Sequence, residues 1–228
     1  MTLSIVIPAY KAAPFIEECL NSVANQKCLG DFEIKVGIDG CHSTLKKLEQ
    51  IRNNYNNLKL YWFEKNQGPY VVLNSLIFST GYDKVIIFNA DDIMLDGLVY
   101  EVYHNLSHYP VVRFCYQQIC GSKVTLKKSQ ITANGVFGIQ HKTFLDMNGF
   151  RGYRVGADSD FKERLIHCGI PIKNLKKKAY FIRRKHPDAL TVDPKTGPDS
   201  EFRKNCKEKM KQCMYLDLPI TVTSYREI

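Results

Sequence analysis

The clearest chemical feature of the sequence is a pair of adjacent carboxylates, Asp91 and Asp92, which follows the apolar stretch 84–88. Two neighbouring carboxylates repel each other when they are buried, unless a cation lies close to both. Oxygen ligands in such a loop suit Mg²⁺ or Mn²⁺, ions that commonly hold phosphate groups. The pair therefore predicts a metal site. One alternative stays open, because Asp92 directly before residues 93–95 could instead cap a helix.

The elements that must position this pair alternate along the first half of the chain. Short β-rich segments are expected at 3–7, 32–38, 58–63 and 84–88, and apolar residues at helical spacing predict helices at 15–23, 45–51 and 70–78. Such alternation predicts an α/β fold with an open, mostly parallel sheet flanked by helices. Ligands of these sheets bind beyond the carboxyl ends of the strands. Four segments lie there, namely Pro8-Ala9-Tyr10, Asp39-Gly40, Asn66-Gln67-Gly68 and Asn89-Ala90-Asp91-Asp92.

The pattern changes after Leu98. Strands are expected at 111–118 and 123–126, with antiparallel pairing, and a short strand is expected at 135–139. A helix over 158–168 would place Phe161, Leu165 and Ile166 on its apolar face, and a basic helix is expected over 199–215. The proline-rich segment 186–198 predicts an irregular loop over the site.

Composition excludes several classes of protein. The chain has 228 residues, of which 44% are hydrophobic, so intrinsic disorder and low-complexity classes are excluded. No apolar run is long enough to span a bilayer, and the N-terminus predicts a strand and not a signal peptide. The eight cysteines are dispersed and form no C-x-x-C pair, so we expect reduced thiols in a cytosolic protein.

The charge is concentrated near the C-terminus. Residues 173–228 hold 14 Lys and Arg against 7 Asp and Glu, which accounts for +7 of the total of +9. A solvated helix face would explain these cations. An anionic membrane surface, an acidic glycan or a nucleic-acid backbone would explain them as well.

Six short motifs follow one another between residues 3 and 192. They are Ser4-Ile5-Val6-Ile7-Pro8-Ala9-Tyr10-Lys11 with the helix that follows; Gly37-Ile38-Asp39-Gly40-Cys41-His42-Ser43; Asn66-Gln67-Gly68-Pro69-Tyr70 with Asn74; Ile87-Phe88-Asn89-Ala90-Asp91-Asp92; Gly156-Ala157-Asp158-Ser159-Asp160-Phe161 with Arg164; and Arg184-Lys185-His186-Pro187-Asp188-Ala189-Leu190-Thr191. In this order they resemble the motifs of family 2 glycosyltransferases with the GT-A fold. The resemblance implies an inverting enzyme that uses a nucleoside-diphosphate sugar, such as a UDP-sugar, and a divalent cation, Mn²⁺ or Mg²⁺.

The resemblance also implies roles for individual residues. Pro8, Ala9, Tyr10 and Asp39 would surround the nucleotide base, and Asp39 would accept hydrogen bonds from it. Asn74 would belong to the nucleotide site, and Gly68 would allow close approach of the backbone. Asp91 and Asp92 would hold the ribose and the metal, which acts as a Lewis acid for the departing diphosphate. His186 would be a further contact to the metal or the diphosphate.

The same resemblance implies a catalytic base. An inverting displacement needs a carboxylate within hydrogen-bond reach of the acceptor hydroxyl, opposite the leaving group. Asp158 is the expected base, and Asp160 is the fallback or the supporting acid. Asp158 could also act only as a helix N-cap.

The sequence departs from the family pattern at three motif positions. Asn89 stands where an aspartate is frequent, Ala157 replaces an acidic residue, and Ala189 replaces a frequent serine. Two competing functions therefore stay open. A catalytically silent nucleotide-sugar-binding domain is one, and a sugar nucleotidyltransferase is the other, although residues 8–11 lack the glycine-rich loop that such enzymes have.

We expect a GT-A domain at 1–192, with a nucleotide-sugar-binding half at 1–98 and an acceptor-binding half at 99–192. A basic helical extension at 193–228 would follow it. The acceptor expected for the family is a cell-surface or capsular glycan, often linked to a lipid. The protein would then be peripheral at the inner face of a membrane. A hydroxylated base of viral DNA is an alternative acceptor.

Overall fold

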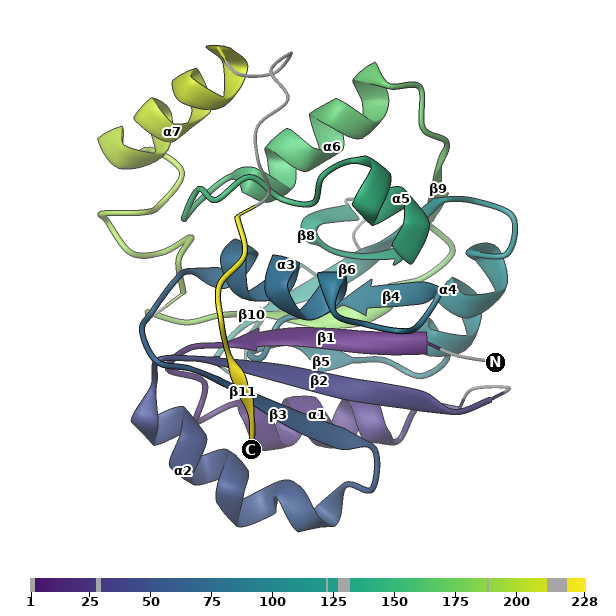
Figure 1. Ribbon diagram of the computed structural model, residues 1–228, viewed down its shortest axis with the longest axis vertical. Helices are drawn as coiled ribbons and strands as arrows, with labels where there is room; N and C mark the ends of the chain where they lie inside the picture. Colours follow the sequence, from purple (N-terminus) through teal and green to yellow (C-terminus); the bar gives the residue numbers. More distant parts are fainter. Residues whose placement is uncertain (1–2, 28–29, 122, 127–131, 188, 213–220) are drawn as a thin grey trace.

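The computed structural model describes residues 3–27, 30–121, 123–126, 132–187, 189–212 and 221–228 (Figure 1). Its first half alternates strands and helices as the sequence predicts. The elements are β1 (Leu3–Ala9), α1 (Ile16–Ala24), β2 (Phe32–Asp39), α2 (His42–Ile51), the 3₁₀ turn η1 (Arg52–Asn54), β3 (Leu58–Phe63), α3 (Pro69–Phe78) and β4 (Lys84–Ile87). These four strands pair in parallel in the order β3-β2-β1-β4. The chain adds β2 and β3 on one side of β1 and then β4 on the other, so the strand order reverses at β1. Ligands bind at such a reversal in open α/β sheets.

The second half turns the sheet into a mixed one. Its elements are β5 (Ile93–Met94), α4 (Leu98–Asn105), β6 (Val111–Cys120), β7 (Lys123–Leu126), β8 (Thr132–Gln140), α5 (His141–Asp146), α6 (Ala157–His167), β9 (Ile172–Leu175), β10 (Phe181–Lys185), α7 (Glu201–Gln212) and β11 (Arg226–Glu227). β8 lies antiparallel between β4 and β6. The described residues between β6 and β8 contain no helix, and a parallel pair would need such a crossover. The expected parallel pairing therefore holds for β1 to β4, whereas the complete sheet is mixed.

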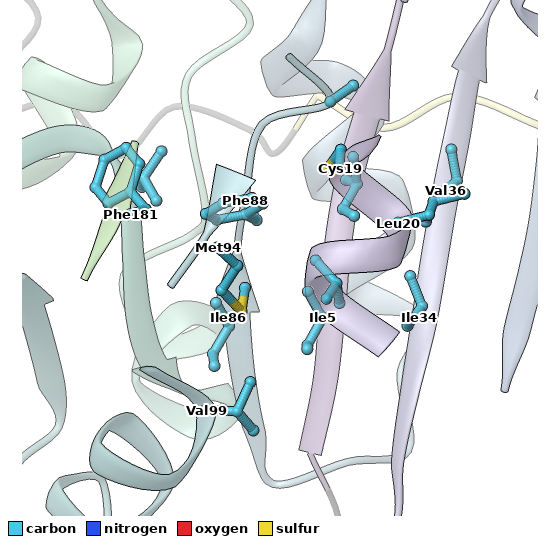
Figure 2. Close-up of a cluster of buried hydrophobic side chains, with 14 of the residues drawn as sticks. Ile5, Cys19, Leu20, Ile34, Val36, Ile86, Phe88, Met94, Val99 and Phe181 are labelled. Carbon is cyan, nitrogen blue, oxygen red and sulfur yellow. The ribbon is translucent and has the colours of Figure 1, made fainter. Parts of the chain in front are cut away.

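Alternating side chains of the strands fill two cores. Ile5 and Ile7 of β1 belong to the larger core, which α1, α2 and α4 cover, whereas Val6 belongs to the core beneath α3, α5 and α6. Figure 2 shows Ile5 and Val36 of neighbouring strands close to Leu20 of α1 in the larger core. Burial on both faces explains why β1 and β4 are nearly continuous apolar runs. The central strands are therefore held from both sides, and their ends are fixed positions for functional groups.

Two expectations of local structure need correction. Ile166 was expected on the apolar face of the 158–168 helix, but it is 52% exposed. In α6, helical spacing places Phe161 and Leu165 together in the core, and Ile166 is one position beyond that stripe. The possible helix cap at Asp92 is also absent, because the short strand β5 follows it and α4 begins only at Leu98.

The segment after residue 192 is joined to the rest of the fold. Helix α7 lies beside α6, and its Cys206 and Met210 pack against Val155 and Tyr153 in the segment before α6. The described residues from 221 onward run beside α3 to β11 (Figure 1). β11 pairs antiparallel with β3. Residues 213–220, which include the end of the expected 199–215 helix, lie outside the described residues. The described part of the expected extension thus contains a helix and also an edge strand of the sheet.

The cysteines and helices of the described chain give two further observations. The six described cysteines are free thiols, as predicted, and Cys28 and Cys213 lie outside the described residues. In the part of the chain that the structure describes, every helix is too short or too polar to cross a membrane.

Candidate active site

A cavity of about 590 Å³ opens at the carboxyl ends of β1, β2 and β4. Its walls come from the first four strand ends, from the N-terminus of α6, from the end of β10 and from α7. Most of the residues predicted from the sequence line it, namely Pro8, Ala9, Tyr10, Asp39, Gly68, Asp91, Asp92, Asp158 and His186. The order of the strands therefore gathers residues that are up to 178 positions apart in the chain.

Asp39 holds the turn that follows β3. Its carboxylate oxygens accept the backbone N–H groups of Gln67 at 2.6 Å and Gly68 at 2.9 Å. Burial raises the pKa of Asp39, and the two hydrogen bonds counteract that rise. Gly68 has φ +91°, a conformation that favours glycine, so this residue is required by the turn itself. The strand end and the turn form one rigid wall of the cavity.

Asp91 lies beside His186 at the opposite wall. The Asp91 Oδ2 and His186 Nε2 atoms are 2.9 Å apart. The ring of His186 packs against Phe15 at 4.5 Å between centroids, and its other nitrogen, Nδ1, is buried without a hydrogen-bond partner among the described residues. The Asp91 side chain is 30% exposed. An imidazole and a carboxylate, both potential metal ligands, thus meet at the end of β10.

Asp92 is buried directly behind this pair. Its Oδ1 accepts the backbone N–H of Arg184, and its Oδ2 accepts the side-chain amide of Asn89, both at 2.9 Å. Burial, and then the charge of Asp91, raise the pKa of Asp92 to about 7. The family pattern favours an aspartate at position 89. Here Asn89 donates a hydrogen bond to Asp92, which is 1% exposed. Both Asp92 oxygens already have donors, so Asp91 has the more available carboxylate.

Asp158 lies across the cavity in the first turn of α6. The N-cap of that helix is Gly156, so Asp158 does not cap it. The hydroxyl of Tyr70 donates to Asp158 Oδ1 at 2.9 Å. Burial and the charge of Asp158 raise the pKa of Tyr70 well above its usual range, so the phenol stays protonated as a donor. Asp158 Oδ2 lies next to Gly135 of β8, where the missing side chain leaves room beside the carboxylate.

Two predicted residues do not line the cavity. Asn74 is fully buried in α3. Its side-chain nitrogen donates to the carbonyls of Phe150 and Thr221, and its side-chain oxygen accepts the backbone N–H of Phe150. Asp160 is paired with Arg151 at 2.8 Å and with Arg164 at 3.0 Å, and its side chain is 1% exposed. Asn74 thus joins α3 to the backbone of Phe150 and Thr221, and Asp160 joins α6 to Arg151 before it. Neither side chain lines the cavity.

Several lining residues were not selected from the sequence. Arg154 lies beside Gly68 and bonds the backbone and side chain of Asn66. Arg203 belongs to α7, where the sequence suggested only a basic surface, and Asn134 belongs to β8. None of these three lies in a motif that could have singled it out, since only the tertiary structure brings them to the cavity. The predicted loop 186–198 also lines it, although Asp188 lies outside the described residues.

The sequence also matches known proteins. The family model described as "Glycosyl transferase family 2" matches residues 4–162. The chain belongs to this family. A relative, the uncharacterized glycosyltransferase MG060 of Mycoplasma genitalium, is 30% identical over 135 residues, which are 56% of this chain. The match spans 45% of the length of that relative.

Solved structures share the fold of this family 2 chain. TarS 1–349 of S. aureus in complex with UDP has a TM-score of 0.68 at 19% identity over 92% of the chain and 69% of TarS 1–349. The complex of the same TarS fragment with UDP-GlcNAc gives a TM-score of 0.70 at 22% identity, covering 82% of the chain and 59% of the fragment. GalNAc-T7 with UDP, GalNAc and Mn²⁺ gives 0.69 at 13% identity, covering 82% and 44%. These similarities confirm the expected GT-A fold.

Proposed function

We propose that this chain is an inverting glycosyltransferase that moves a sugar from a UDP-sugar to a hydroxyl group of an acceptor. The observation that carries the proposal is the convergence of Asp39, Asp91, His186 and Asp158 on one cavity at the strand reversal. Membership of the family and fold neighbours that hold UDP and UDP-GlcNAc support the same activity.

In this proposal the nucleotide binds along the ends of β1 and β2. Pro8, Ala9 and Tyr10 form one side of the base site, and Tyr10 is 50% exposed, as a ring that covers a bound base would be. Asp39 accepts from the base with the lone pairs that Gln67 and Gly68 leave unused.

A divalent cation fits beside Asp91 and His186. Among the residues that the structure describes, no three His, Cys, Asp or Glu side chains form a metal cluster. Mg²⁺ and Mn²⁺ sites of nucleotide enzymes need fewer protein ligands, because the ion takes oxygens from the phosphates. The Asp91 carboxylate, which is 30% exposed, and the Nε2 atom of His186 at 2.9 Å from it suit such a site. When bound, the ion would supply Lewis-acid stabilisation of the departing diphosphate. Asp92 would fix the position of the neighbouring Asp91 through its hydrogen bonds with Arg184 and Asn89.

In this proposal Asp158 acts as the general base. Its Oδ1 is held by Tyr70, and its second oxygen is next to Gly135 at the edge of the cavity. In the reaction, Asp158 takes the proton of the acceptor hydroxyl as the acceptor oxygen bonds to the anomeric carbon. The bond from that carbon to the diphosphate oxygen breaks at the same time, and UDP leaves with the electron pair.

Release of UDP tests the proposal. A panel of UDP-sugars is incubated with the protein and Mn²⁺ or Mg²⁺, and free UDP is measured with and without EDTA. We expect release from at least one donor, loss of release in EDTA, and restoration by excess cation. Asp91→Ala should lose both release and affinity for UDP with Mn²⁺, while the melting temperature stays within a few degrees. Tight donor binding without any release would instead favour the silent binding domain, and full release in EDTA would exclude the metal assignment.

The acceptor is proposed to be a glycan, free or linked to a lipid, at a cell surface or in a capsule. The exposed lysines of α7 suit docking at an anionic membrane surface, so the enzyme would be peripheral at the cytoplasmic face.

A further inference from the structure

A second, more open pocket of about 650 Å³ lies beside the donor cavity. The two share five lining residues, namely Ala133, Asn134, Asp158, Arg183 and Thr191. Asp158 therefore stands where the two spaces meet. An acceptor that lies in the second pocket would present a hydroxyl to the proposed base.

The lining of this second pocket is strongly cationic. Arg113 of β6, Lys162 of α6, Lys176 after β9 and Arg183 of β10 all line it, and Asp158 is the one acidic residue among its described lining residues. The four cations come from three elements and the segment after β9, so only the tertiary structure brings them together. A patch of this kind attracts an anion at the edge of the site.

The cations are largely left without carboxylate partners inside the protein. Between residues that the structure describes, no ion pair involves Arg113, Lys176 or Arg183. Arg113 instead donates to neutral acceptors, the carbonyls of Thr132 and Ala133 and the side chain of Asn134. Lys162 pairs with its exposed neighbour Glu163, at 3.5 Å. Positive charge is thus held in place and left for a ligand to neutralise.

From this arrangement we propose that the second pocket binds the acceptor and that the acceptor is an anionic glycan, which carries carboxylate or phosphate groups near the reacting hydroxyl. The proposal rests on the proposed function, because it takes Asp158 as the base. A nucleic acid is the less suitable occupant. The one aromatic residue among the described lining residues is Tyr116, which is 8% exposed and offers little surface for stacking bases.

Binding of matched oligosaccharides tests this proposal. The probes are fluorescein-labelled tetragalacturonate, a phosphorylated maltotetraose, neutral maltotetraose and a short duplex DNA, each titrated by anisotropy in the presence of UDP and Mn²⁺. We expect at least one anionic glycan to bind about tenfold more tightly than the neutral one, since a hydrogen bond to a charged group contributes roughly that factor. The carboxylate and phosphate probes distinguish the two kinds of anion.

Two double variants locate the binding. Lys162→Gln with Lys176→Gln removes two cations that line the second pocket but not the donor cavity. It should abolish the preference for the anionic glycan and leave UDP affinity unchanged. Lys207→Gln with Lys209→Gln removes the same charge from the exposed face of α7 and should retain the preference.

Several results would overturn the proposal. They are equal binding of anionic and neutral glycans, absence of binding by either anionic glycan, an equal loss in both double variants, or tighter binding of the duplex than of the glycans. Failure of the wild-type protein to bind UDP would instead contradict the proposed function, so the two failures are distinguishable.

Discussion

At the scale of single residues, the acidic side chains of the cavity divide into two groups. Asp39 and Asp92 have both oxygens bonded to N–H donors of the protein, so they fix the shape of the strand ends. Among the described residues, Asp91 hydrogen-bonds the side chain of His186 and Asp158 that of Tyr70, and both carboxylates line the cavity. This difference in partners predicts which substitutions affect shape and which affect chemistry.

Asp158→Asn should lower turnover by about 10²- to 10⁴-fold, because proton transfer to a positioned base contributes roughly that much. The amide keeps the size of the side chain and can still accept from Tyr70, so folding should be little affected. The expected pattern is near-normal UDP affinity by calorimetry, a near-normal melting temperature and collapsed UDP release. Wild-type turnover in this variant would show that the base lies elsewhere.

Asp92 should make stability depend on pH. Its pKa of about 7 in the folded protein is above the ordinary value of 3.8, so the folded state binds the proton more tightly than the unfolded state. Stability from this group is therefore greatest at acidic pH and declines as pH rises from about 4 through 7.

The substitution Asp92→Asn should flatten that dependence. The amide keeps an acceptor for the N–H of Arg184, and the amide of Asn89 can turn to present its oxygen. Melting temperatures of both proteins are measured from pH 5 to 8 without metal, a window around the folded pKa of about 7. A parallel decline in the two proteins would contradict the assignment.

At the scale of elements, helix α6 is anchored by a buried ionic cluster. Asp160 bonds Arg151 from the loop before the helix and Arg164 one turn further along it. Arg164 also donates to the carbonyls of Met147 and Gly149 at the end of α5, and Arg151 donates to the carbonyl of Met210 in α7. The cluster joins three helices and so fixes the position of Asp158, two residues before Asp160.

Asp160→Asn should destabilise the fold by about 3–5 kcal/mol, because loss of one partner leaves buried cations uncompensated. The measurement is urea unfolding, with the exposed pair of Lys142 and Asp146 as the control. Asp146→Asn should change the free energy of unfolding by about 0.5 kcal/mol or less. If Asp160→Asn is as stable as the wild type but inactive, Asp160 has the chemical role that its burial argues against.

At the scale of the whole molecule, helix α7 presents a basic face to the solvent. Lysines 204, 207, 209 and 211 of α7 are exposed, and the helix also contributes Arg203 to the donor cavity. A surface that contacts α7 would therefore lie beside the entrance of the site. Docking at an anionic membrane would bring a lipid-linked acceptor toward the cavity.

Vesicles that contain phosphatidylglycerol should bind the protein at about 50 mM salt and release it at about 500 mM, because salt screens exposed charges. Lys207→Gln with Lys209→Gln should weaken binding about thirtyfold, since each lysine near such a surface contributes about 1 kcal/mol. The double variant at Lys162 and Lys176 is the matched control. Unchanged binding in the α7 variant would show that these lysines form a solvated helix face and do not dock at the membrane. Binding to duplex DNA but not to vesicles would favour a DNA acceptor.

The sequence alone determined the strand–helix order of the first half and most of the donor site. Apolar runs and helical periodicity are local signals, and the carboxyl ends of parallel strands meet at one edge, so Asp39, Asp91 and Gly68 could be assigned to one site before their positions were known. The roles given to them stay predictions.

Only the tertiary structure decided which acids are available and what surrounds them. Asp158 and Asp160 stand two positions apart on one helix, so spacing could not tell that the first lines the cavity and the second is buried between two arginines. The cations of the pocket beside Asp158 come from three elements and the segment after β9, which no local pattern connects. The antiparallel strand β8 and the return of the chain to β3 at β11 depend on long-range pairing, which local sequence signals do not encode.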